Sequence, residues 1–321
     1  MRKEIAEQSA PGLRCCPICG HNGAEDWLKA PDRFHQRPQL YHLVRCPSCS
    51  LVWIDNPPRP EEMAHHYGPN YDRLIAGAGE ASPERWRKRR ETLALYKSGG
   101  RLLDIGCSSG SFLVSLKEGP WELYGIEMSP DSAKKAEVRS GAQVFAGDIL
   151  AAPFPPETFD VVTCFDVFEH VYHPRQVLEK VWEWLKPGGI FYTLVPNIDS
   201  AGARIFRSYW YALELPRHLR HFSLASLRHL SRSVGFQEVS LAIHRELFIE
   251  YSARYIYDEI LRRLGLSRAP LATAQAPSIP WRAVRKILRW TFLPLLSQLA
   301  SVAGDGECIY AILRKEPPRE D

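Results

Sequence analysis

Four cysteines in two matching pairs carry the clearest chemistry near the start of the chain. The sequence reads CPICG around Cys16 and Cys19 and CPSCS around Cys46 and Cys49. Two such pairs can supply four thiolates to one tetrahedral zinc ion and leave no coordination position open for catalysis. A segment of about forty residues buries too little apolar surface to hold itself together. We therefore expect a zinc ribbon in which a structural Zn²⁺ contributes much of the folding free energy.

The other cysteines have weaker claims to chemistry. Cys15 adjoins the first pair, and we favour Cys16 as the ligand because it keeps the C-P-x-C pattern symmetric. Cys107, Cys164 and Cys308 fall in apolar strand-like or loop segments, where cysteine is more often a small buried side chain than a nucleophile. The first dozen residues lack the apolar stretch of a secretion signal. The thiols are thus expected to be reduced, in a cytoplasmic protein.

A second group of polar residues follows three successive strand-like segments. The segment LLDIG leads into the loop CSSGSF and then a helical stretch, so backbone N–H groups at a helix start face a ligand beyond the strand. Gly106 and Gly110 let that ligand approach the backbone. Ser108 and Ser111 stand where a G-x-G-x-x-G fingerprint requires glycine. A dinucleotide site is therefore disfavoured, and a different nucleoside is expected.

The next two strand-like segments each end near an acidic residue. Glu127 ends the second one, where a carboxylate can accept hydrogen bonds from both ribose hydroxyls. Asp148 follows the third, where its carboxylate and the adjacent backbone suit an adenine amino group, and Ile149 offers the ring an apolar face. These residues predict an adenosine-binding edge.

The segments between these residues alternate in type. From Arg101 onward, short β-type runs alternate with helical stretches, which is typical of βαβ units and a parallel sheet. The helix HPRQVLEKVWEWLK is expected to stop at Pro187-Gly188-Gly189, and later strands are read at FQEVSLAIHR and ECIYAILRK. The sequence therefore predicts an α/β fold.

The order of these motifs resembles the class I S-adenosyl-L-methionine (SAM)-dependent methyltransferases from about Arg101 to Arg245. The family pattern, an acid followed by G-x-G-x-G, reads D-I-G-C-S-S-G, with Ser108 in place of the middle glycine. The resemblance implies a Rossmann-like seven-stranded sheet with helices on both faces, and SAM as the cofactor. The cofactor-binding residues that it implies are Asp104, Gly106, Cys107, Gly110, Glu127, Met128, Asp148, Ile149 and Phe165.

Methyl transfer from a sulfonium is an in-line displacement, so the protein must align the acceptor and remove its proton. We favour His170 and His221 as candidate bases among a wider set of Asp166, Glu169, His170, His173, His218 and His221. The run D-V-F-E-H also resembles the E-x-x-E-H segment of ubiquinone-biosynthesis O-methyltransferases, in which acidic and histidine side chains hold a divalent ion. By that resemblance Asp166, Glu169 and His170 would form a second metal site, although we favour pocket walls without a metal.

Six segments are expected along the chain. They are a flexible N-terminus (1–12), the zinc-ribbon module (13–56), a linker and helical lead-in (57–96), the SAM-binding core (97–245), a helical insert or cap (246–305), and the last core strand with a tail (306–321). The stretch 281–304 is basic and amphipathic, which is typical of membrane-surface helices, active-site caps and dimer interfaces. A homodimer and a peripheral membrane contact, the latter suiting a lipid-linked acceptor, are both consistent with it.

The whole order of motifs resembles bacterial methyltransferases that modify sugars, glycans or other biosynthetic intermediates. A methyltransferase acting on RNA is the enzymatic alternative, since zinc ribbons can clamp nucleic acid. The formal net charge of +4 is low for that role, and the N-P-P at 56–58 lies in the linker instead of after the fourth core strand. Nucleic acid is therefore a disfavoured partner. A noncatalytic SAM-binding scaffold is the alternative from another class, and absence of turnover despite SAM binding would reveal it.

Overall fold

A computed structural model describes residues 14–67, 83–244, 248–265, 286 and 306–316. The expectations for residues 1–12, and for 281–304 apart from Lys286, lie outside these ranges. Among the described residues, no helix is long and apolar enough to cross a membrane.

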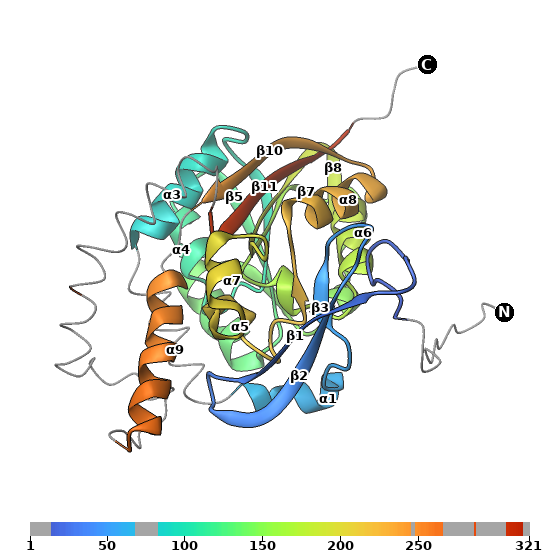
Figure 1. Ribbon diagram of the computed structural model, residues 1–321. Coiled ribbons are helices and arrows are strands. Elements are labelled where there is room, and N and C mark those ends of the chain that lie inside the picture. The colour runs from blue at the N-terminus through green and yellow to red at the C-terminus, as the bar shows by residue number, and fades with distance from the viewer. Residues whose placement is uncertain (1–13, 68–82, 245–247, 266–285, 287–305, 317–321) are drawn as a thin grey trace.

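A seven-stranded sheet forms the centre of the protein (Figure 1). Its order is β10-β11-β8-β7-β4-β5-β6, with β4 to β8 parallel and β11 antiparallel to both of its neighbours. The strands are β4 (Gly100–Ile105), β5 (Trp121–Glu127), β6 (Gln143–Ala146), β7 (Phe159–Phe165), β8 (Leu185–Pro196), β10 (Phe236–His244) and β11 (Cys308–Lys315). The predicted α/β fold with a seven-stranded sheet is confirmed.

Helices cover both faces of this sheet. Successive strand residues point to opposite sides, so neighbouring residues of one strand pack against different helices. Leu102 packs with α3, α4 and α5 on one face, and Leu103 packs with α6 and α8 on the other. These helices are α3 (Pro83–Ala94), α4 (Ser111–Leu116), α5 (Pro130–Ser140), α6 (Pro174–Trp184) and α8 (Leu224–Val234). Helix α6 ends at Trp184, earlier than predicted, because Leu185 is already extended just ahead of the Lys186-Pro187 pair.

Local sequence explains where the helices begin and end. At α5, the Ser129 hydroxyl accepts the Ser132 N–H at 3.3 Å, Pro130 stands at the first turn, and Gly141 closes the helix at φ 77°. Ser223 and Ser226 form a reciprocal cap at α8.

The cysteine-containing segment forms a second sheet of order β1-β2-β3-β9. Its strands are β1 (Glu25–Asp32), β2 (Arg37–Arg45), β3 (Val52–Ile54) and β9 (Arg220–His221). The fourth strand comes from the predicted SAM-binding core (97–245), since Val52 pairs with His221 and Trp53 with Arg220. The N-terminal sheet is thus completed by a segment distant in sequence.

The two sheets also share a core. Ile18, between the first two cysteines, is buried in the same apolar cluster as Leu178 of α6 and Leu227 of α8. The Arg175 guanidinium donates to the Ile18 carbonyl at 2.6 Å (Nη2) and 3.2 Å (Nε). The remaining helices lie around the N-terminal sheet: α1 (Pro60–Met63), α7 (Ala201–Phe206), α9 (Phe248–Arg263) and the 3₁₀ turns Ala64–His66, Arg207–Tyr209 and Tyr211–Leu213.

Candidate active site

The predicted cofactor residues lie at one edge of the central sheet. Strands β6, β5, β4 and β7 are parallel neighbours, so their carboxyl ends meet there. Glu127 and Asp104 stand at or next to the ends of β5 and β4, Phe165 ends β7, and Asp148 follows β6. The structure thus brings together side chains spread over about sixty residues of sequence, as the βαβ order predicts.

Asp104 is buried in the floor of this edge. Its carboxylate accepts a hydrogen bond from the Thr163 hydroxyl on β7 at 2.7 Å, and its side chain has almost no contact with solvent. Burial raises the pKa of Asp104 to about 7, against the opposing effects of Thr163 and the Arg89 charge. The carboxyl group therefore changes its charge close to neutral pH.

Glu127 organises the loop beside it. One carboxylate oxygen accepts the Ser108 N–H and the other accepts the Ser129 N–H, each at 2.9 Å. These bonds tie the loop after β4 to the loop after β5 and fix the direction of the carboxylate. Backbone strain accompanies the arrangement, since Ser108 has φ 49°.

Glycine is required at two positions of the loop, each for a distinct physical reason. At Gly106, φ is 69° and an added Cβ would lie 2.3 Å from Val167 Cγ2. At Gly110, which precedes α4 with φ 78°, an added Cβ would lie 2.9 Å from the Ala136 Cα on α5. Glycine is thus required by packing as well as by conformation. Cys107 is buried, and burial raises the pKa of its thiol, which fits a packing role.

The residues predicted for adenosine lie at the outer end of this edge. Asp148 caps the 3₁₀ turn Ile149–Ala151, accepting the Leu150 N–H at 2.8 Å. Met128 is 63% exposed, so its side chain is accessible to the adenine ring of an adenosine whose ribose binds Glu127.

Arg89 of α3 lies at this edge, although the sequence analysis did not single it out. Its buried guanidinium lies over the Phe165 ring at 4.1 Å and donates to Asp166 at 3.1 Å. Trp86, Arg89 and Leu93 share one helix face by their spacing, so an arginine within an apolar stripe was the available signal. A buried cation beside Asp104 suits the carboxylate of an amino acid.

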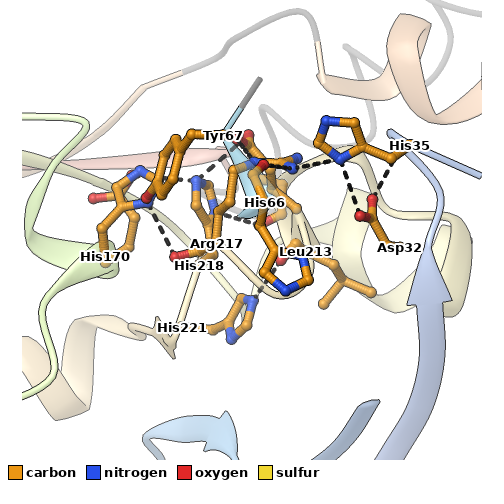
Figure 2. Close-up of polar contacts among 12 residues, drawn as sticks. Asp32, His35, His66, Tyr67, His170, Leu213, Arg217, His218 and His221 are labelled. Carbon is orange, nitrogen blue, oxygen red and sulfur yellow. Dashed lines mark hydrogen bonds and ion pairs between the residues drawn. The ribbon is translucent and has the colours of Figure 1, made fainter. Parts of the chain in front are cut away.

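His170 lies in the 3₁₀ turn Phe168–His170, which follows the end of β7 (Figure 2). Its Nδ1 is 3.0 Å from the Arg217 carbonyl and 3.1 Å from the Tyr67 hydroxyl. A carbonyl can only accept, so Nδ1 carries the proton and Nε2 keeps a lone pair. Burial lowers the pKa of His170, which keeps the ring neutral at neutral pH.

Buried ionisable side chains surround this histidine. His218 Nε2 lies 3.5 Å from Glu214 and 3.9 Å from Glu169, and the His170 and His218 rings meet edge to face. Burial raises the pKa of Glu169 well above its usual range and lowers the pKa of His218 to about 3. Glu169, His170 and His218 each present one ligand atom within 4.8 Å of the others. Asp166 instead faces Arg89, so the group able to hold an ion differs from the one that the D-V-F-E-H pattern suggested.

The N-terminal segment forms part of the same cluster (Figure 2). The Arg217 guanidinium donates to Glu214 and to the His66 carbonyl, each at 3.0 Å, and lies 3.1 Å from His35 Nδ1. His35 Nδ1 also lies 3.0 Å from the Asp32 carboxylate. This nitrogen can form a hydrogen bond with either Arg217 or Asp32, but not with both at once. The cluster around His170 is thus assembled from the N-terminal segment and from residues 169–218.

His221, the second predicted base, lies in β9. Its Nε2 is 3.1 Å from the Leu213 carbonyl, and burial lowers its pKa to about 4. Both His221 and His218 are nearly inaccessible to solvent, whereas His170 is partly exposed.

The four predicted metal ligands converge in the N-terminal module. The Sγ atoms of Cys16 and Cys49 are 3.5 Å apart, as are those of Cys19 and Cys46, and all four lie within 4.8 Å. The two knuckles have the same backbone bonds: Gly20 N–H donates to the Cys16 carbonyl and Ser50 N–H to the Cys46 carbonyl, both at 3.0 Å. Tetrahedral zinc with bonds of about 2.3 Å requires sulfurs about 3.8 Å apart, so the four thiols fit Zn²⁺. Cys15 is exposed and points to the Gly20 carbonyl instead.

Comparison with known proteins agrees with this architecture. Residues 78–241 match the family model described as "Methyltransferase domain". A demethylmenaquinone methyltransferase of Deinococcus radiodurans is 31% identical over 166 residues, which cover 49% of this chain and 68% of the relative. A ubiquinone biosynthesis O-methyltransferase of Burkholderia thailandensis is 30% identical over 156 residues, covering 44% and 67%.

A solved structure has the same fold at low sequence identity. The SAM-dependent methyltransferase of Archaeoglobus fulgidus superposes with a TM-score of 0.51 at 19% identity, covering 76% of this chain and 98% of that one. The matched region spans the four strand ends where Asp104, Glu127, Asp148 and Phe165 lie. The chain belongs to the methyltransferase domain family and is a class I SAM-dependent methyltransferase.

Proposed function

We propose that the enzyme transfers the methyl group of SAM to an oxygen or carbon atom of a hydroxyl-bearing biosynthetic intermediate, namely a sugar, a glycan or a lipid-linked molecule. The names of the two relatives, which concern demethylmenaquinone and ubiquinone biosynthesis, support a small-molecule acceptor. The observation that carries the proposal is a neutral, partly exposed His170 whose Nε2 keeps a lone pair, in the turn that follows strand β7.

The roles of the residues follow from their placement. SAM supplies an electrophilic methyl group on a sulfonium. Glu127 would accept the ribose hydroxyls, Asp148 and Ile149 would face the adenine, and Met128 would cover it. Asp104 and Arg89 offer opposite charges to the ammonium and carboxylate of the methionine portion. His170 Nε2 would take the proton that the acceptor loses as its bond to the methyl group forms.

The proton-accepting role is tested by His170→Gln, which keeps a polar side chain but has no basic nitrogen. Once a panel of sugar, glycan and lipid-linked acceptors identifies a substrate, kcat should fall on the order of 100-fold while the Kd for SAM stays unchanged. His221→Gln is measured in parallel, because its ring is the second predicted base. Turnover by His170→Gln within about threefold of the wild type would assign the proton transfer elsewhere.

The buried Asp104 predicts a pH dependence of cofactor binding. The pKa of Asp104 is raised to about 7, so the ionised carboxylate that attracts the ammonium of SAM forms as pH rises. The affinity for SAM should therefore increase about tenfold between pH 6 and pH 8, with proton release on binding below pH 7. Calorimetry in buffers of different ionisation enthalpy measures both quantities. Asp104→Asn should bind more weakly at pH 8 and lose the pH dependence; an unchanged profile in this variant would remove Asp104 from the cofactor site.

We also propose a structural Zn²⁺ held by Cys16, Cys19, Cys46 and Cys49, with no open position for a substrate. Whether Glu169, His170 and His218 hold a second ion is decided by metal analysis of the purified protein. One zinc per chain supports His170 as a base, and a second divalent ion that His218→Ala abolishes would support a metal-assisted acceptor site instead.

A further inference from the structure

Three arginines of the described chain, Arg89, Arg217 and Arg220, are almost completely buried. Arg89 is paired with Asp166 and Arg217 with Glu214. No carboxylate in the part of the chain that the structure describes lies within ion-pair distance of Arg220, which is 7% exposed. Burying a cation without a counter-charge is costly, so the environment of Arg220 needs a physical explanation.

The hydrogen bonds of Arg220 leave its charge uncompensated. Its Nη2 donates to the Tyr172 carbonyl at 2.9 Å and its Nη1 to the Leu219 carbonyl at 3.1 Å. Both acceptors are neutral, and Nε is a buried donor without a partner among the described residues. Neutral carbonyls satisfy donors but supply no negative charge.

Strand pairing connects Arg220 with the cysteine cluster. Arg220 lies in β9 opposite Trp53 of β3, and Trp53 packs in the same buried cluster as Cys16. Burial lowers the pKa of Arg220 to about 10, and the Cys16 thiolate is the first charge that acts to raise it again. β3 begins three residues after Cys49, and directly paired residues face the same side of a sheet. The Arg220 side chain therefore points to the face on which Trp53 packs with Cys16.

A tetrathiolate zinc centre would supply the negative charge that the Arg220 cation lacks as a partner. Four thiolates and one Zn²⁺ leave two negative charges in excess, and Cys16, Cys46 and Cys49 are buried. We propose that Arg220 is the charge partner of the zinc centre and thereby couples metal binding to β9, the strand that also carries His221. The inference rests on the proposed zinc site.

The affinity for Zn²⁺ tests the charge partnership. Arg220→Met removes the charge and should weaken Zn²⁺ binding about 10- to 100-fold, the usual effect of losing an outer-shell partner. Arg220→Lys retains the charge and should bind within about fivefold of the wild type. The measurement is competition for Zn²⁺ against a chromophoric chelator at low ionic strength, with the full-length chain.

Arg45→Met is the matched control. Arg45 precedes Cys46, but its side chain is 32% exposed and pairs with Asp199 at 2.9 Å, so removing its charge should change the affinity for Zn²⁺ less than about twofold. If Arg220→Met does not fold, Arg220→Gln, which can still donate to a carbonyl, takes its place with the same expected loss. Zn²⁺ affinity within threefold of the wild type in a folded, uncharged variant would overturn the proposal.

The coupling to β9 is tested separately, by hydrogen exchange of the peptide spanning residues 217–223. Removing Zn²⁺ from the wild type should increase exchange there at least tenfold, because strand pairing protects these amides; unchanged protection would contradict the coupling. A wild type that binds no Zn²⁺ would instead refute the zinc proposal itself. The two failures are therefore distinguishable.

Discussion

Replacing Glu127 by alanine is expected to weaken SAM binding on the order of 1000-fold. The carboxylate would accept both ribose hydroxyls, and each hydrogen bond to a charged acceptor contributes about 1.5–3 kcal/mol. The same carboxylate holds the Ser108 and Ser129 N–H groups, so its loss also frees the loop that faces the cofactor. Calorimetric titration with SAM at pH 8 measures the effect.

Glu127→Gln separates the hydrogen bonds to the ribose from the effect of Glu127 on the loop. The amide keeps the shape and one acceptor oxygen, so it should lose about tenfold, far less than alanine. Circular dichroism would show that both variants remain folded. An alanine variant that binds SAM as the wild type does would exclude Glu127 from the ribose site and place the cofactor differently on the sheet edge.

Removal of the metal is expected to destabilise the whole protein and not the N-terminal module alone. Structural zinc contributes on the order of 10 kcal/mol in small modules, and here Cys16 and Cys49 share one buried cluster with α6 and α8. Cys49→Ser should abolish stoichiometric zinc and lower the Tm of a single cooperative transition by at least about 10 °C.

Cys15→Ser is the control for this experiment. Cys15 is exposed and lies outside the four-sulfur cluster, so its replacement should leave zinc content unchanged and the Tm within about 2 °C. Two separate transitions in Cys49→Ser, with the upper one at the wild-type temperature, would contradict the shared core. Loss of zinc in Cys15→Ser would instead move Cys15 into the ligand set.

The sequence was sufficient to predict the central sheet and the edge where the predicted cofactor residues meet. Strand-ending Glu127 and the D-I-G-C-S-S-G loop are local patterns, and the right-handed βαβ rule converts local patterns into a spatial order. The four-cysteine cluster was also predictable from local patterns, since each C-x-x-C pair forms its own knuckle.

Other features could not be read from local patterns. The pairing of β3 with β9 involves two- and three-residue strands, whose period is too short to detect and whose partners are far apart in sequence. Arg89 lies in a helix rich in surface charges, so its burial depends on packing against Phe165. The choice between His170 and His221 depends on exposure and on hydrogen-bond partners, which sequence does not encode locally.

The strand exchange between the two sheets has a consequence for biosynthesis. Residues 14–54 leave the ribosome well before the fourth strand of their sheet, Arg220–His221, which is made only after most of the methyltransferase core. The N-terminal module therefore cannot complete its sheet until translation has passed His221, even though all four cysteines of the proposed zinc site are synthesised much earlier. Its completion waits for the other part of the chain, so the cysteine-containing segment is synthesised before the core and reaches its native packing only together with it.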